Sequence, residues 1–89
     1  MIRAIKQRCG SDYPVWCRID GIEFLTEGGI THEDAKDTAR MAEAAGADAI
    51  HVSSYADASK GESFTTAHTT HTPCGFVDCA AGIKAVVRI

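Results

Sequence analysis

The sequence predicts an α/β fold built on parallel strands, as part of a larger repeat of strands and helices. Two apolar segments of strand length, residues 14–20 and 48–53, flank residues 32–45, which have the apolar spacing of a helix. A strand, a helix and a second strand in this order form a βαβ crossover, in which the two strands are parallel. The order of the segments therefore predicts a parallel sheet covered by helices.

The first predicted helix covers residues 2–8. Ile2 and Ile5 lie three residues apart among basic residues, as on one face of a helix. The basic residues lie toward the end of this segment, where they suit the negative end of the helix dipole. Gly10 is the expected stop, because glycine readily adopts the left-handed conformation that ends many helices.

The first strand is predicted at residues 14–20. This run is almost continuously apolar and contains Arg18 near its end, a profile typical of a strand buried on both faces of a parallel sheet. Residues 21–29, which contain three glycines, are expected to form a loop. The strand is thus expected to finish at Asp20.

The second helix is predicted to begin after Thr31. Asp34 follows Thr31 by three residues, which is the spacing of a capping box. We expect the helix to run from His32 to Ala45, with Gly46 closing it. The residues expected to face the sheet are small or flexible, and they are Ala35, Ala39, Met41 and Ala42.

The second strand, at residues 48–53, is followed by a long loop at residues 54–73. This loop lies at the carboxyl end of a parallel strand, where α/β proteins place their ligands. A last amphipathic helix is predicted from the spacing of Phe76, Cys79, Ala80, Ile83 and Val86 or Val87. Two strands cannot bury the faces of three helices, so we expect residues 1–89 to be a fragment of one larger domain.

Composition and charge narrow the class of protein. The chain is 45% hydrophobic and 24% charged, as is typical of soluble globular proteins. Its net charge of -3 offers no basic patch for nucleic acid or an anionic membrane. We find neither a signal-peptide core nor an apolar stretch of membrane-spanning length. We therefore expect a cytoplasmic protein that binds neither nucleic acid nor a membrane surface.

The four cysteines are expected to be reduced thiols, because the cytosol disfavours disulfides. Cys17 lies within the first predicted strand, and Cys79 lies on the apolar face of the last predicted helix. Both are therefore expected to serve as small buried hydrophobic residues.

Several segments, in this order and spacing, resemble one family along nearly the whole chain. The segments are Ile2-Arg3-Ala4-Ile5 with Gly10, Pro14-Val15-Trp16-Cys17-Arg18-Ile19, Glu23-Phe24 with Glu27-Gly28-Gly29-Ile30-Thr31, Ala44-Ala45-Gly46-Ala47-Asp48-Ala49-Ile50-His51-Val52-Ser53, and Phe76-Val77-Asp78 with Ala80-Ala81-Gly82-Ile83-Lys84. The sequence thereby resembles the flavin-dependent Old Yellow Enzyme barrels. The most similar branch is that of the NADH:flavin oxidoreductases that includes the 2,4-dienoyl-CoA reductases.

The resemblance implies a partial (β/α)8 TIM barrel that holds FMN at the carboxyl ends of its strands. The chain would cover the end of helix 4, strand 5, helix 5, strand 6, a long loop and helix 6. The implied activity is hydride transfer from NAD(P)H through the flavin to the activated C=C bond of an enone or enoyl thioester. The isolated fragment is expected to be inactive, because most of the implied flavin site lies outside it.

Three residues are predicted to belong to the site. Arg18 matches the arginine that in this family lies against the pyrimidine edge of the flavin, where a fixed positive charge stabilises the reduced cofactor. Alternatively, Arg18 forms a structural ion pair with Asp20 or Glu23. His51 and Ser53 alternate onto one face of the second strand, beside the substrate cavity of the family. His51 could instead be an ordinary half-buried strand residue.

The long loop departs from the family pattern. The dienoyl-CoA reductases carry a substrate-side histidine in this region, but the matching position here falls near Lys60. His68 and His71 lie several residues later, so neither is assigned a catalytic role.

Three alternatives stay open at the level of sequence. His68, His71, Cys74 and Cys79 offer nitrogen and sulfur donors for a zinc ion, although their spacing is not that of common zinc sites. A second alternative is a βα barrel without flavin, because fold does not determine chemistry. A third is a self-associating module, since uncovered sheet edges and helix faces recruit partners.

Overall fold

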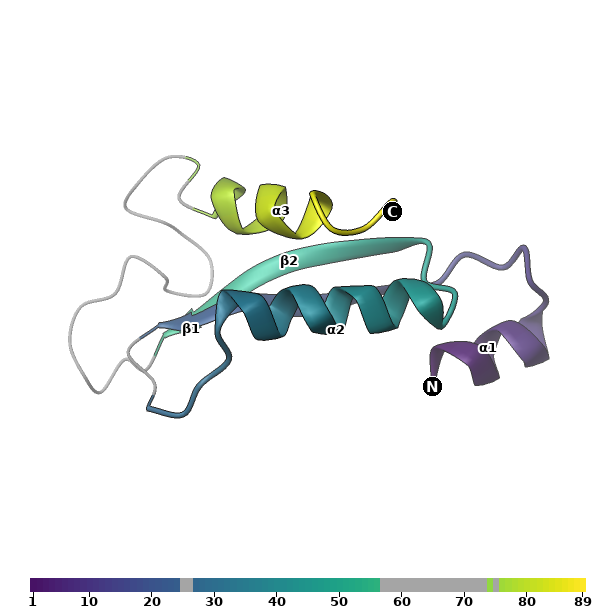
Figure 1. The fold of residues 1–89 in the computed structure, drawn as a ribbon. Helices are drawn as coiled ribbons and strands as arrows, with labels where there is room; N and C mark the ends of the chain where they lie inside the picture. The colour runs from purple at the N-terminus through teal and green to yellow at the C-terminus, as the bar shows by residue number, and fades with distance from the viewer. Residues whose placement is uncertain (25–26, 57–73, 75) are drawn as a thin grey trace.

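A computed structural model describes residues 1–24, 27–56, 74 and 76–89. Its elements are α1 (Ile2–Cys9), β1 (Trp16–Phe24), α2 (His32–Ala44), β2 (Ala49–Ala56) and α3 (Val77–Lys84) (Figure 1). The predicted order of helices and strands is confirmed. Of the predicted long loop, residues 54–56 belong to β2 and residues 57–73 lie outside the described residues.

β1 and β2 form a parallel pair, as the crossover predicts. Trp16 lies opposite Ala49, and Asp20 lies opposite Ser53. The register shifts between Asp20 and Glu23, and Glu23 then lies opposite Tyr55. The predicted end of the strand at Asp20 is therefore wrong, because pairing resumes beyond an irregularity of the kind that a β-bulge produces.

Gly21 lies in this irregularity and is required there by close packing. A Cβ atom at position 21 would lie 2.9 Å from the Cβ atom of Cys79 and 2.9 Å from Cγ1 of Val52. Real Cβ atoms essentially never approach other atoms under 3.0 Å. The absence of a side chain thus lets α3 approach β1 closely.

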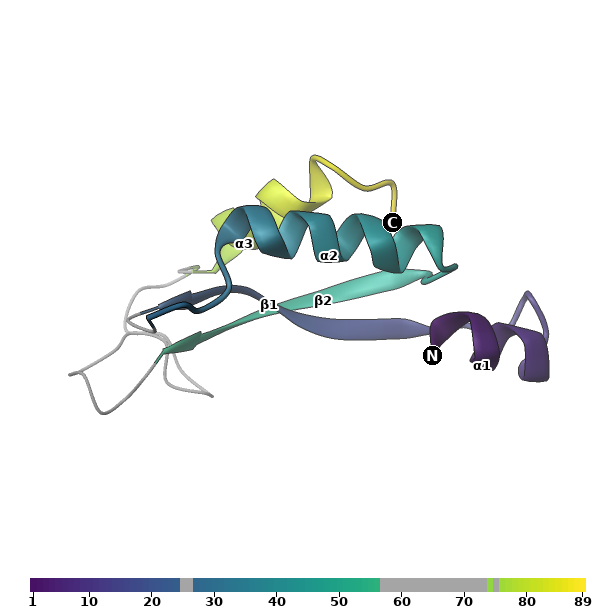
Figure 2. The ribbon, with the colours of Figure 1, turned by 60° about the horizontal axis from the view of Figure 1, so that its bottom comes forward.

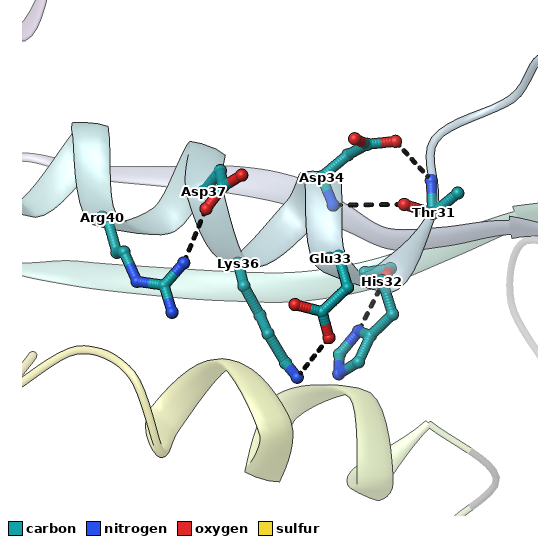
Figure 3. A network of polar contacts seen from close by, with 8 residues as sticks. Thr31, His32, Glu33, Asp34, Lys36, Asp37 and Arg40 are labelled. Atoms are coloured by element: carbon teal, nitrogen blue, oxygen red, sulfur yellow. Dashed lines mark hydrogen bonds and ion pairs between the residues drawn. The ribbon is translucent and has the colours of Figure 1, made fainter.

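α2 begins with the predicted capping box, drawn in Figure 3. The Asp34 amide donates to Thr31 Oγ1 at 3.2 Å, and the Thr31 amide donates to Asp34 Oδ2 at 2.9 Å. These hydrogen bonds, the one from the Thr31 backbone first, lower the pKa of Asp34. The helix is stabilised because two amides of its first turn gain acceptors.

The alanines of α2 form the face that packs on the sheet. Ala35, Ala39 and Ala42 are buried, with exposed fractions of 1%, 0% and 8%. Met41 was predicted to share this face, but it is 65% exposed. The prediction is wrong because position 41 lies well around the helix from the stripe that residues three and four apart create.

Both α2 and α3 lie on the same face of the sheet (Figure 2). The core consists of Ala35, Ala39, Ile83 and Val87, and Ile19, Ile50 and Val52 of the strands pack against it. Val87 contributes from beyond α3, which ends at Lys84. No helix of the described residues covers the opposite face, so the prediction that β1 is buried on both faces is wrong for these residues.

Lys6 connects α1 to the start of the strands. Lys6 Nζ donates to Asp48 Oδ2 at 2.6 Å and to the Tyr13 carbonyl oxygen at 2.8 Å. The same Asp48 oxygen accepts the Val15 amide at 2.8 Å. The hydrogen bond from Lys6, followed by that from Val15, lowers the pKa of Asp48. α1 ends at Cys9, and Gly10 follows as the predicted stop, with a φ of 102°.

None of the described helices combines the length and the apolar character that crossing a bilayer requires.

Candidate functional site

The three predicted site residues lie on one face of the sheet. Ile19 of β1 packs against the helices, and so do Ile50 and Val52 of β2. Side chains alternate between the faces of a strand, so the residues between these positions point the other way. We call this side the open face, and its members are Trp16, Arg18, Asp20, His51 and Ser53.

The strand register sets the neighbours within the open face. Arg18 lies opposite His51, and Asp20 lies opposite Ser53. Arg18 and His51 are exposed, whereas Asp20 and Ser53 are half-buried. Trp16 is 66% exposed although it is large and mostly apolar. The open face therefore combines an aromatic surface, a cation, an imidazole and a carboxylate–hydroxyl pair.

Arg18 has no polar partner among the described residues. The ion pairs of this part of the chain involve Lys6, Lys36 and Arg40 instead. The alternative that Arg18 pairs with Asp20 or Glu23 is thus not what the structure shows.

Both carboxylates near Arg18 have other partners. Asp20 Oδ1 accepts a hydrogen bond from Ser53 Oγ at 2.5 Å. Glu23 Oε2 accepts the Ile30 amide at 2.9 Å. Any molecule or protein segment that covered the open face would therefore have to offer Arg18 a hydrogen-bond acceptor or negative charge, because an unpaired buried cation is costly.

Two features of the site differ from the expectation. Arg18 was expected at the end of its strand, but it is the third residue of β1, which continues to Phe24 beyond the register shift. Asp20 was considered only as a counter-ion for Arg18, whereas its partner is Ser53. The alternation of side chains from Arg18 could have placed Trp16 and Asp20 on this face, but the pairing with Ser53 requires the register of the two strands.

His32 joins three elements on the opposite side of the sheet. Its Nδ1 atom lies 3.0 Å from the Gly21 carbonyl oxygen, and Figure 3 shows the ring pointing away from α2 toward α3. A Cβ atom at Gly82 would collide with the ring. His32 thus packs the first turn of α2 between β1 and α3, away from the open face.

The ion pairs of α2 also lie outside the open face. Lys36 Nζ contacts Glu33 Oε1 at 2.8 Å, and Arg40 contacts Asp37 at 2.6 Å (Figure 3). The hydrogen bond from Lys36 lowers the pKa of Glu33. These exposed pairs span one turn of the helix and stabilise it modestly.

Of the four ligands of the alternative zinc site, Cys74 and Cys79 belong to the described residues, and His68 and His71 lie outside them. Burial, followed by the charge of Asp78, raises the pKa of the Cys79 thiol, which disfavours the thiolate that binds metals. Within residues 1–24, 27–56, 74 and 76–89, no group of three or more histidines, cysteines or acidic residues could hold a metal ion.

Comparison with known proteins gives one informative similarity. Neither a protein-family model nor a solved structure matches the chain. A segment of 53 residues, 60% of the chain, is 47% identical to an NADH oxidase of Thermoanaerobacter brockii. The match covers 8% of that relative, so the chain spans only a small part of the curated protein it resembles.

Proposed function

We propose that the chain is part of an FMN-dependent oxidoreductase of the Old Yellow Enzyme type. In this proposal it forms the end of helix 4 through helix 6 of a (β/α)8 barrel. Among the described residues, the helices that pack on the parallel strands lie on one face, and the wall of such a barrel likewise has its helices on the side away from the axis. The similarity to an NADH oxidase segment supports an NADH-dependent oxidoreductase.

The observation that carries the proposal is the guanidinium of Arg18 on the open face, which forms no ion pair with any residue that the structure describes. A cation fixed on a sheet and free of carboxylate contacts can bind an electron-rich ligand edge without first breaking an ion pair. The chemistry that FMN supplies when bound is two-electron transfer, from NAD(P)H to the activated C=C bond of an enone or enoyl thioester. Arg18 would hold the pyrimidine edge and stabilise negative charge there.

His51 and Ser53 are proposed to face the substrate. His51 is exposed and lies opposite Arg18, and its side chain has no hydrogen-bond partner among the described residues. Its imidazole can therefore donate a hydrogen bond to a substrate carbonyl oxygen, which would polarise the acceptor. Ser53 lies two residues further along the same face.

The full-length protein that contains these residues provides the test. It should be purified and examined for flavin-like visible absorbance. NADH or NADPH, added without oxygen, should bleach the absorbance, and an enone or enoyl thioester should restore it. A full-length protein that stays colourless after addition of FMN would contradict the proposal. The 89-residue chain alone should not catalyse the reaction, because one arginine and two strands do not enclose a flavin.

We also propose that the separate chain associates with itself. Trp16 is exposed on the open face, and within the part of the chain that the structure describes the sheet has two strands, each with one edge that no other strand pairs with. Sedimentation velocity should show a concentration-dependent increase in mass. A monomer at all concentrations would refute this proposal.

A further inference from the structure

We propose that Ser53 is a positioning residue that keeps Arg18 available by holding the Asp20 carboxylate. The inference rests on the proposed function, in which Arg18 binds the flavin. It assigns to Ser53 a role that acts through Asp20 and Arg18, in addition to the expected contact with substrate.

A short hydrogen bond joins Ser53 to Asp20. Ser53 Oγ lies 2.5 Å from Asp20 Oδ1 and 3.3 Å from the Ile19 carbonyl oxygen. A hydroxyl group has one hydrogen, and the shorter contact has the length of a charge-assisted hydrogen bond to a carboxylate. The Ser53 hydrogen is therefore directed to Asp20, and only the lone pairs of the hydroxyl oxygen remain for a substrate.

Without this hydrogen bond, Asp20 would be able to pair with Arg18. Asp20 and Arg18 lie two residues apart on one strand, so both side chains belong to the open face. An aspartate this close to an arginine on the same face of a sheet is expected to form an ion pair with it. Even so, no ion pair joins them. The register explains this, because it places the Ser53 hydroxyl directly opposite Asp20.

The partner of Asp20 determines how well Arg18 can bind a ligand on the open face. While Ser53 holds Asp20, the charge of Arg18 is not cancelled by a carboxylate in contact with it. If Asp20 were released, it would compete with an electron-rich ligand for the guanidinium. Ser53 thereby raises the capacity of Arg18 to stabilise negative charge on the proposed flavin.

The test on the 89-residue chain uses site-resolved chemical modification. The monomeric fraction is treated with phenylglyoxal, and the rate at each arginine is measured by peptide mass spectrometry. Arg8 is exposed and has no ion pair among the described residues, so it serves as the internal standard. Ser53→Ala should slow the modification of Arg18 by about two- to fivefold, the protection that an exposed ion pair can give.

Two further variants separate the inference from a general change of structure. Ser53→Thr keeps the hydroxyl and should leave the Arg18 rate unchanged. Asp20→Asn added to Ser53→Ala removes the competing charge and should restore the original rate. The inference is overturned if Ser53→Ala leaves the Arg18 rate unchanged, or if Asp20→Asn does not reverse the slowing.

In the full-length protein the same variants have a second readout. Ser53→Ala should lower the midpoint potential of the bound flavin, and Asp20→Asn should raise it again. A full-length protein without flavin would refute the proposed function alone, because the modification experiment needs no cofactor. A flavoprotein in which Ser53→Ala changes neither the potential nor the Arg18 rate would refute the inference alone.

Discussion

Replacing Ile83 with alanine should destabilise the chain by about 3 kcal/mol. Ile83 is 2% exposed and lies in the core with Ala35, Ala39 and Val87. The substitution removes three buried carbons, which cost about 2.4 kcal/mol at about 0.8 kcal/mol each. A residual cavity adds to this cost, because the flanking alanines are too short to fill it, and buried isoleucine-to-alanine changes cost about 2–5 kcal/mol.

Urea denaturation followed by circular dichroism provides the measurement. The matched control is Val77→Ala in the same helix, since Val77 is 55% exposed. This control should change the free energy of unfolding by less than about 0.5 kcal/mol. If Ile83→Ala were as mild as Val77→Ala, α3 would not pack on the sheet through Ile83 and the described core would be wrong.

Three further predictions concern the cap, the attachment of α1 and the close approach at β1. Thr31→Ala should destabilise the chain by about 1 kcal/mol in urea, because the Asp34 amide loses its acceptor, whereas Thr31→Ser should not. Acid should release α1 from the start of the strands. The pKa of Asp48 is lowered in the folded chain, so the stabilisation that Asp48 provides is present above the ordinary aspartate pKa. This stabilisation is lost as the pH falls through the lowered value. Amide exchange of α1 should rise on acidification relative to that of α2, and Asp48→Asn should remove this pH dependence. Gly21→Ala should cost about 1–3 kcal/mol, because the added methyl group overpacks the contact with α3. An unchanged urea midpoint in Gly21→Ala would contradict this prediction, because α3 would then be able to move away from β1 without a loss of stability.

Much of the fold could be predicted because its signals are local. The capping box depends only on the spacing of Thr31 and Asp34, and the end of α1 depends on the freedom of Gly10. The parallel pairing followed from the order of a strand, a helix and a strand. These features hold because each is fixed within a few residues or by the direction of the chain.

The errors concern contacts between segments. The extension of β1 beyond Asp20 depends on the partner strand, and a run that contains Gly21 by itself favours a loop. The exposure of Met41 depends on which stripe of α2 faces the sheet, which the alanines decide by packing closely. The composition of β1 alone predicts burial on both faces, but the described residues supply helices for one face of the sheet.

The shared face of His51 and Ser53 could be predicted from the sequence, but the contacts on the open face could not. Alternation along β2 placed His51 and Ser53 on one face, and the structure adds Arg18 to that face through the register. Whether Arg18 is paired could not be read from the sequence, because Asp20 is close to it in either case. The distance from Ser53 to Asp20 identifies the partner of Asp20. Arg18 forms no ion pair within the described part of the chain.

We propose that Arg18 faces the flavin in the full-length protein. The most direct measurement is the midpoint potential of the flavin in Arg18→Ala, compared with the parent and with Arg40→Ala. Arg40 pairs with Asp37 on α2, away from the open face, and serves as the matched control. The potential should fall in Arg18→Ala, because a positive charge that stabilises reduced flavin is lost, and should be unchanged in Arg40→Ala. An unchanged potential in Arg18→Ala, with flavin bound, would contradict the claim.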